Sequence, residues 1–144
     1  MPKINIWAVV VAAAVAFVQG ALWYSPLLFG KAWMELSGID PATANAVPPV
    51  WVLVAEFVRE LVIAAVLAYF IVKAGVVDWT GGLKLACLVW IGFYAAIYTG
   101  AVIHEGMPLK LYVIHAGDGL VKILLMAAIL GTWRGRRPVP ASTE

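Results

Sequence analysis

Four long runs of apolar residues alternate with shorter polar segments along the chain. The runs cover residues 4–24, 50–72, 83–103 and 111–133. Each has roughly 20 residues, which is enough for a helix to cross the ~30 Å hydrocarbon layer of a membrane. Gly, Pro, Asp and Asn gather in the breaks between them, at 28–49, 73–82 and 104–110. The pattern predicts one all-α domain over residues 1–144, an integral membrane four-helix bundle.

Composition supports this class and excludes others. Of the 144 residues, 64% are hydrophobic and only 12% are charged, which is too much apolar surface for so small a soluble globule to bury. The formal net charge of +2 does not point to nucleic acid as a partner. One cysteine, Cys87, cannot form an internal disulfide. Membrane lipid is therefore the expected surrounding of the chain.

Basic residues predict the orientation of the four spans. Cytoplasmic loops are enriched in Lys and Arg. The side shared by both termini and the 73–82 loop has six of them: Lys3, Lys73, Lys84, Arg134, Arg136 and Arg137. The other side has Lys31 and Lys110. We therefore expect both termini, including the basic tail at 134–144, to be cytoplasmic. The 28–49 connection would then lie outside, either as an ordered loop or with a short interfacial helix over 30–38 that Gly38 ends.

Small residues recur at intervals of four on two of the spans. They are Ala12, Ala16 and Gly20 on the first, and Gly92, Ala96 and Gly100 on the third. This spacing lets helices approach closely. The two helices are predicted either to pack together within one chain or to mediate homo-oligomerisation.

Charged residues within the second and fourth spans are the most informative feature. They are Glu56, Arg59 and Glu60, and His115, Asp118 and Lys122. Both sets follow helical spacing, so each forms one polar stripe. At ~1.5 Å per residue, Glu60 and Lys122 share a level near mid-bilayer, while Glu56 and Arg59 bracket Asp118. We therefore predict that the two helices face each other and that the charges pair between them.

Other polar residues are predicted to reach the same outer half of the bundle. Gln19 and Tyr98 join the pathway candidates, and Tyr24, His104 and Glu105 are candidates at the outer face. Towards the cytoplasmic side the same two helix faces turn apolar, with Leu67 and Met126 among their residues.

Three roles remain open for this ionisable cluster. Charges inside a membrane mark a substrate, ion or proton pathway by default, which favours a small homo-oligomeric transport or permeation unit. The charges are alternatively salt-bridge staples in a non-catalytic assembly module. A third role is an outward-facing ligand or metal site at His104, Glu105, His115 and Asp118.

The chemistry-bearing motifs of enzymes are missing from the sequence. There are only two histidines and no HExxH pattern, and Lys122 beside Asp118 would repel a cation. The chain also lacks a nucleophilic triad, a phosphate-binding glycine loop and a nucleotide fingerprint. The sequence therefore favours a protein that is not an enzyme, with no metal or cofactor and no catalytic residues.

Several local motifs resemble one known family. Trp23-Tyr24-Ser25-Pro26, Leu28-Phe29-Gly30 and Trp33 are similar to the N-terminal signature of the domain of unknown function 1761 family. Looser matches follow at Trp90-Ile91-Gly92-Phe93, at Glu105-Gly106 with Pro108-Leu109-Lys110-Leu111, and at Gly131-Thr132-Trp133. The resemblance implies a small four-span protein of the bacterial inner membrane, and no activity. At Gly117-Asp118-Gly119 the family more usually has an aromatic residue after the first glycine, so a role for Asp118 with Lys122 is expected to be particular to this chain.

Overall fold

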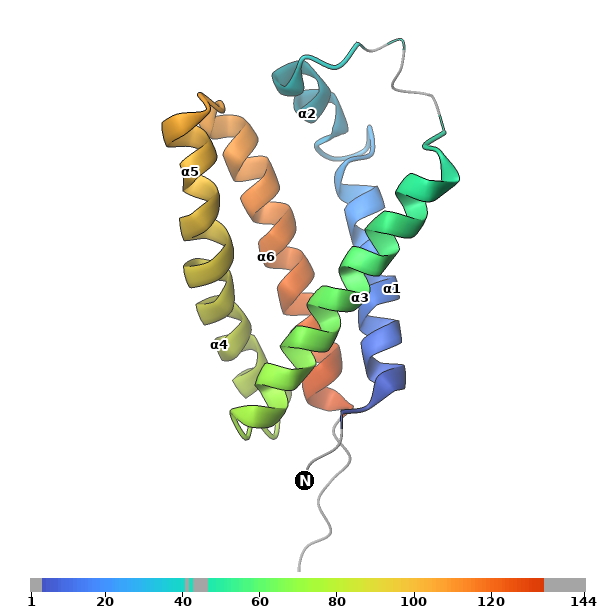
Figure 1. Ribbon diagram of the computed structural model, residues 1–144, viewed down its shortest axis with the longest axis vertical. Coiled ribbons are helices and arrows are strands. Elements are labelled where there is room, and N and C mark those ends of the chain that lie inside the picture. Colours follow the sequence, from blue (N-terminus) through green and yellow to red (C-terminus); the bar gives the residue numbers. More distant parts are fainter. Residues whose placement is uncertain (1–3, 41, 43–46, 134–144) are drawn as a thin grey trace, which may run out of the picture.

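The computed structural model describes residues 4–40, 42 and 47–133, and the regular elements of this part are helices. In chain order they are α1 (Ile6–Trp23), α2 (Gly30–Ser37), α3 (Val50–Lys73), α4 (Trp79–Val89), η2 (Trp90–Ala95), α5 (Ala96–His104) and α6 (Leu109–Thr132) (Figure 1). The π-helical segment η2 joins α4 to α5 in one continuous helix, Trp79–His104. The predicted all-α class is confirmed, while the basic tail at 134–144 lies outside the described residues.

Helix ends follow from the residues found there. The Asn5 side chain accepts hydrogen bonds from the backbone N–H groups of Trp7 and Ala8 and so caps the start of α1. Asp78 caps α4 in the same way, through the Gly81 N–H at 2.7 Å. Gly38 ends α2 in the left-handed conformation, with φ 66°. The short helix expected in the 28–49 connection is therefore present.

Three helices of the described part are long and apolar enough to cross a membrane. They are Ile6–Trp23, Trp79–His104 and Leu109–Thr132. Helix α3 is as long as α6, with 24 residues each. Every 18-residue stretch of α3, however, contains Glu56, Arg59 and Glu60. Those three charges set α3 apart from the other long helices.

Helix α6 lies at the centre of the fold. It packs on α1 and on α4, and it also contacts α3, α2, α5 and η2 (Figure 1). The apolar core gathers at the end of the molecule away from α2. It comprises mainly small side chains of α1, α3, α4 and α6, among them Ala12, Ala16, Ala64, Ala86 and Ala127. We call the other end, which carries α2, the α2 end.

The small residues of α1 do not pack on the third predicted span. Ala12 and Ala16 are fully buried, and α1 packs against α3 and α6. On the continuous helix, Cβ atoms added at Gly92 and Gly100 would meet nothing within 4 Å. The predicted packing of these two stripes within one chain is therefore wrong, because α6 lies between the two helices.

The close approach of α4 to α6 uses different glycines. A Cβ at Gly82 would lie 3.0 Å from the Ala127 carbonyl oxygen. One at Gly131 would lie 2.9 Å from both the Asp78 carbonyl oxygen and the Trp79 Cα. Gly82 is therefore a packing residue inside a helix, although Gly81-Gly82 is predicted from sequence as a break. For this reason the helix begins at Trp79 and not at residue 83.

We expect Gly131→Ala to lower the free energy of unfolding by about 1–3 kcal/mol, because the new methyl group would meet backbone atoms. Gly100→Ala is the matched control, since its methyl group enters open space and gains about 0.5–1 kcal/mol of helix propensity. Unfolding in detergent, followed by circular dichroism, measures both. Equal losses in the two variants would contradict this assignment of the packed and open faces.

Candidate functional site

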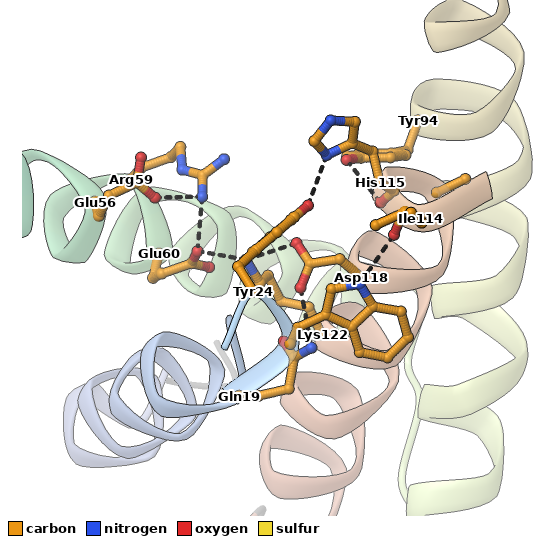
Figure 2. Close-up of polar contacts among 12 residues, drawn as sticks. Gln19, Tyr24, Glu56, Arg59, Glu60, Tyr94, Ile114, His115, Asp118 and Lys122 are labelled. Carbon is orange, nitrogen blue, oxygen red and sulfur yellow. Dashed lines mark hydrogen bonds and ion pairs between the residues drawn. The ribbon is translucent and has the colours of Figure 1, made fainter. Parts of the chain in front are cut away.

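Three charged side chains are buried together where α3 meets α6. Glu60, Asp118 and Lys122 are 1%, 5% and 6% exposed. The Lys122 ammonium donates a hydrogen bond of 2.8 Å to Glu60 Oε1 and lies 3.4 Å from Asp118 Oδ2 (Figure 2). The predicted pairing of Glu60 with Lys122 is confirmed. Lys122 thus links a carboxylate of α3 to one on its own helix.

Helix α1 closes the third side of this triad. Gln19 Nε2 donates a hydrogen bond to Asp118 Oδ1 at 3.0 Å. Gly20, the next residue on α1, leaves room for the Lys122 side chain, since an added Cβ there would lie 3.5 Å from the ammonium. Gln19, a pathway candidate from sequence, therefore belongs to the site. The buried charges join three helices, α1, α3 and α6.

Arg59 extends the cluster towards the surface. Its guanidinium pairs with Glu56 and lies 3.3 Å from Glu60 Oε1. The side chains of Arg59 and Glu56 are 55% and 46% exposed. The prediction that charges pair between the two helices holds for Glu60 and Lys122 but not for Arg59. The Arg59 guanidinium contacts Glu56 and Glu60 on its own helix, and the Asp118 oxygens contact Gln19 and Lys122.

The charges of the cluster do not balance. It has three carboxylates, those of Glu56, Glu60 and Asp118, and two cations, those of Arg59 and Lys122. Two buried oxygens in the described part have no hydrogen-bond partner, Oε2 of Glu60 and Oε1 of Gln19. A buried oxygen without a hydrogen-bond partner costs about 1–3 kcal/mol. By formal charge, the cluster has one carboxylate more than it has cations.

Aromatic residues surround His115, one turn before Asp118 on α6. The Tyr24 hydroxyl lies 2.6 Å from His115 Nδ1, and the Tyr98 ring meets the imidazole edge-on with centroids 5.8 Å apart. Burial, and then the negative charge of Asp118, raise the pKa of the Tyr24 phenol. The phenol therefore keeps its proton, and its hydroxyl oxygen and the imidazole nitrogen lie within hydrogen-bond distance of each other.

Two glycines on α6 make room for aromatic rings on either side of Asp118. An added Cβ at Gly117 would lie 3.0 Å from the Trp23 ring, and one at Gly119 would lie 2.8 Å from the Tyr94 ring. Trp23 Nε1 donates to the Ile114 carbonyl at 3.0 Å, and Tyr94 Oη donates to the His115 carbonyl at 3.2 Å. Trp23 was not a site candidate from the sequence. Glycines inside a helix, on both sides of a charge, were the available signal.

The tight corner between α1 and α2 holds Tyr24 in place. The N–H of Gly30 donates to the Ser25 carbonyl at 3.0 Å, and the N–H of Phe29 donates to the Trp23 carbonyl at the same distance. A Cβ at Gly30 would lie 2.4 Å from the Tyr24 carbonyl oxygen, so this position requires glycine. The signature residues at 23–30 therefore form the corner that places Tyr24 and Trp23 against α6.

His104 and Glu105 do not join the buried cluster. They are exposed and line a separate cavity of about 640 Å³ along α5, together with Tyr94, Tyr98 and other residues. Within residues 4–40, 42 and 47–133, no three His, Cys, Asp or Glu side chains lie close enough to hold a metal ion. The Glu60 carboxylate, which has one oxygen without a hydrogen-bond partner in the described part of the chain, can bind a proton or a small cation.

Comparison with known proteins agrees with the motifs at the α1–α2 corner. A family model described as "Protein of unknown function (DUF1761)" matches residues 7–131, which is most of the chain. No curated protein and no solved structure matches the chain.

Proposed function

The chain belongs to the DUF1761 family, and we propose that it is a membrane transport or permeation unit that binds a proton or another small monovalent cation at Glu60. In this proposal α3 crosses the membrane with the three apolar helices, as a four-helix bundle of the bacterial inner membrane. Both termini are cytoplasmic and the α2 end faces outwards. The missing positive charge of the buried cluster is the observation that carries the proposal.

The route to Glu60 runs from the α2 end. Glu56 and Arg59 are about half exposed, and Arg59 contacts Glu60 directly. Beyond the triad, Leu67 and Met126 are buried in the apolar core, and no ionisable side chain of that core continues the path. Access from one side with a closed layer on the other is the arrangement of an outward-facing state. Ionisable residues inside a membrane mark such pathways by default.

The proposed unit works as a homo-oligomer. Four helices of this length enclose little of a pathway alone. The continuous helix Trp79–His104 supports this, because only 6% of its apolar stretch is buried within the chain, and an added Cβ at Gly92 would meet nothing within 4 Å. Small residues on an open helix face allow a second copy to approach closely.

We expect Glu60→Gln to abolish proton entry into proteoliposomes that contain the protein. The substitution keeps the shape of the side chain, removes its charge and leaves Lys122 paired with Asp118. The measurement is the fluorescence of a pH dye trapped in the lumen after an external acid jump, with the membrane potential clamped by potassium and valinomycin. The variant should match protein-free liposomes.

Glu35→Gln is the control, since Glu35 is an exposed acid of α2 that lies outside the cluster. It should keep most of the wild-type rate. Wild-type flux no faster than that of protein-free liposomes, or equal rates for wild type and Glu60→Gln, would contradict the proposal.

A second role is favoured by the bonding of Lys122. This ammonium touches carboxylates of α3 and α6, and Gln19 ties α1 to the same group. Such a network is a structural staple in a module that assembles with itself or a partner. Replacement of the pair by apolar residues separates this role from transport, because a staple tolerates it and a cation pathway does not.

A further inference from the structure

The cavity along α5 lies on the far side of two tyrosines from the buried cluster. It holds about 640 Å³ and is lined by Phe93, Tyr94, Ile97, Tyr98, His104 and Glu105, among others. Three aromatic rings and a carboxylate therefore face one space. An apolar pocket with a few convergent polar groups is the usual form of a small-molecule site.

The charges of the residues that line the cavity determine whether a cation or an anion suits it. Among the described residues it contains Glu105 and neither lysine nor arginine. Aromatic faces attract cations through the negative charge above the ring, and a nearby carboxylate adds to this attraction. An organic anion would meet no fixed positive partner there. The cavity thus suits a cation that carries apolar groups.

Tyr94 and Tyr98 connect this cavity to the cluster. The Tyr94 ring covers Gly119, the residue after Asp118, and its hydroxyl binds the His115 carbonyl (Figure 2). The Tyr98 ring meets the His115 imidazole at its edge. The two rings lie 5.8 Å apart and form a wall shared by both sites. A cation in the cavity would therefore lie one tyrosine layer from a cluster that lacks a positive charge.

We propose that this cavity binds an organic cation, an ammonium or phosphonium centre with apolar substituents. Binding in the cavity is argued from its lining alone and does not depend on the proposed function, since none of the residues of the buried triad lines the cavity.

Binding of tetraphenylphosphonium to the full chain in lipid nanodiscs tests the proposal. Tetraphenylborate is the matched probe, because it has nearly the same shape and the opposite charge. Equilibrium dialysis against empty nanodiscs corrects for partition into lipid. We expect saturable binding of the cation and no saturable binding of the anion. Saturable binding of both probes, or of neither, would overturn the proposal.

Variants locate the binding. We expect Tyr98→Leu to weaken it about 5- to 30-fold, from the loss of a cation–π partner, and Tyr98→Phe to keep it. Glu105→Gln should weaken it about 2- to 5-fold, as for an exposed charge pair. Glu35→Gln, which changes an exposed acid of α2 outside the cavity, should leave it unchanged. Full affinity in folded Tyr98→Leu and Glu105→Gln would place the probe elsewhere and overturn the assignment.

The source of the natural cation is decided by the lipid of the nanodisc. Weaker binding of the probe in phosphatidylethanolamine than in phosphatidylglycerol nanodiscs would identify a lipid headgroup as the occupant, and equal binding would identify a free cation. The two proposals fail in different ways. If the proposed function is wrong, Glu60→Gln leaves proton entry unchanged while the probe still binds. If only the cation proposal is wrong, the probe does not bind and proton entry is intact.

Discussion

Lys122→Met is expected to lower the free energy of unfolding by about 3–5 kcal/mol, because it leaves two carboxylates buried without their common cation. Glu60 and Asp118 are both within reach of the Lys122 ammonium, at 2.8 and 3.4 Å. Methionine keeps the length and most of the volume of the lysine stem, so the loss reports the charge and not a cavity. Unfolding by sodium dodecyl sulfate, followed by circular dichroism, gives the free energy.

Two further variants make this result interpretable. Lys110→Met removes an exposed lysine from the first turn of the same helix, and its effect should stay within about 0.5 kcal/mol. Glu60→Leu and Asp118→Asn together with Lys122→Met should recover most of the lost stability, since both carboxylates are removed with their common cation. A loss below about 1 kcal/mol in the single variant would refute a tightly coupled buried pair. A triple variant that fails to fold would refute the staple role.

Gly30→Ala is expected to cost about 2–3 kcal/mol, the second largest effect. The methyl carbon would lie 2.4 Å from the Tyr24 carbonyl oxygen and 2.7 Å from the Ser25 carbonyl group. Both are backbone groups inside a corner that two hydrogen bonds hold, so neither yields by a side-chain rotation. The corner must open, and Tyr24 should then lose its contact with His115.

The control for Gly30→Ala is Gly92→Ala, the same substitution in a helix position with nothing within 4 Å. It should leave the protein at least as stable as the wild type. The environment of Trp23 and Trp33, read from near-ultraviolet circular dichroism, should change in the first variant only. An unchanged spectrum together with an unchanged free energy of unfolding would show that the corner tolerates a side chain and that the signature glycine has another purpose.

Much of the fold could be predicted from the sequence, because hydrocarbon imposes a simple length rule on helices. The predicted runs at 4–24, 50–72 and 111–133 differ from α1, α3 and α6 by at most two residues at each end. The early start of the third helix was missed for a physical reason. Glycine normally breaks helices, but Gly82 is needed where α4 touches the Ala127 carbonyl.

The candidate site could be predicted only as far as depth and helical phase determine it. Equal depth was enough to pair Glu60 with Lys122. Depth could not choose a partner for Arg59, because that choice depends on which carboxylate has a free oxygen. Nor could it reveal η2, the π-helical turn at Trp90–Ala95, because no residue type marks such a turn. Tyr94 lies within that turn, and Tyr98 lies just after it on α5.

The distribution of ion pairs also bears on how the chain is made. Lys122 and Asp118 are an i,i+4 pair on α6, and Arg59 and Glu56 are an i,i+3 pair on α3. Each charged helix therefore carries a counter-ion of its own before it meets any other helix. If α3 crosses the membrane, as proposed above, it is synthesised and inserted well before α6. The local pairs would then lower the cost of its early stay in lipid, before a partner helix has been synthesised. Only the last carboxylate, Glu60, must await α6 for its lysine.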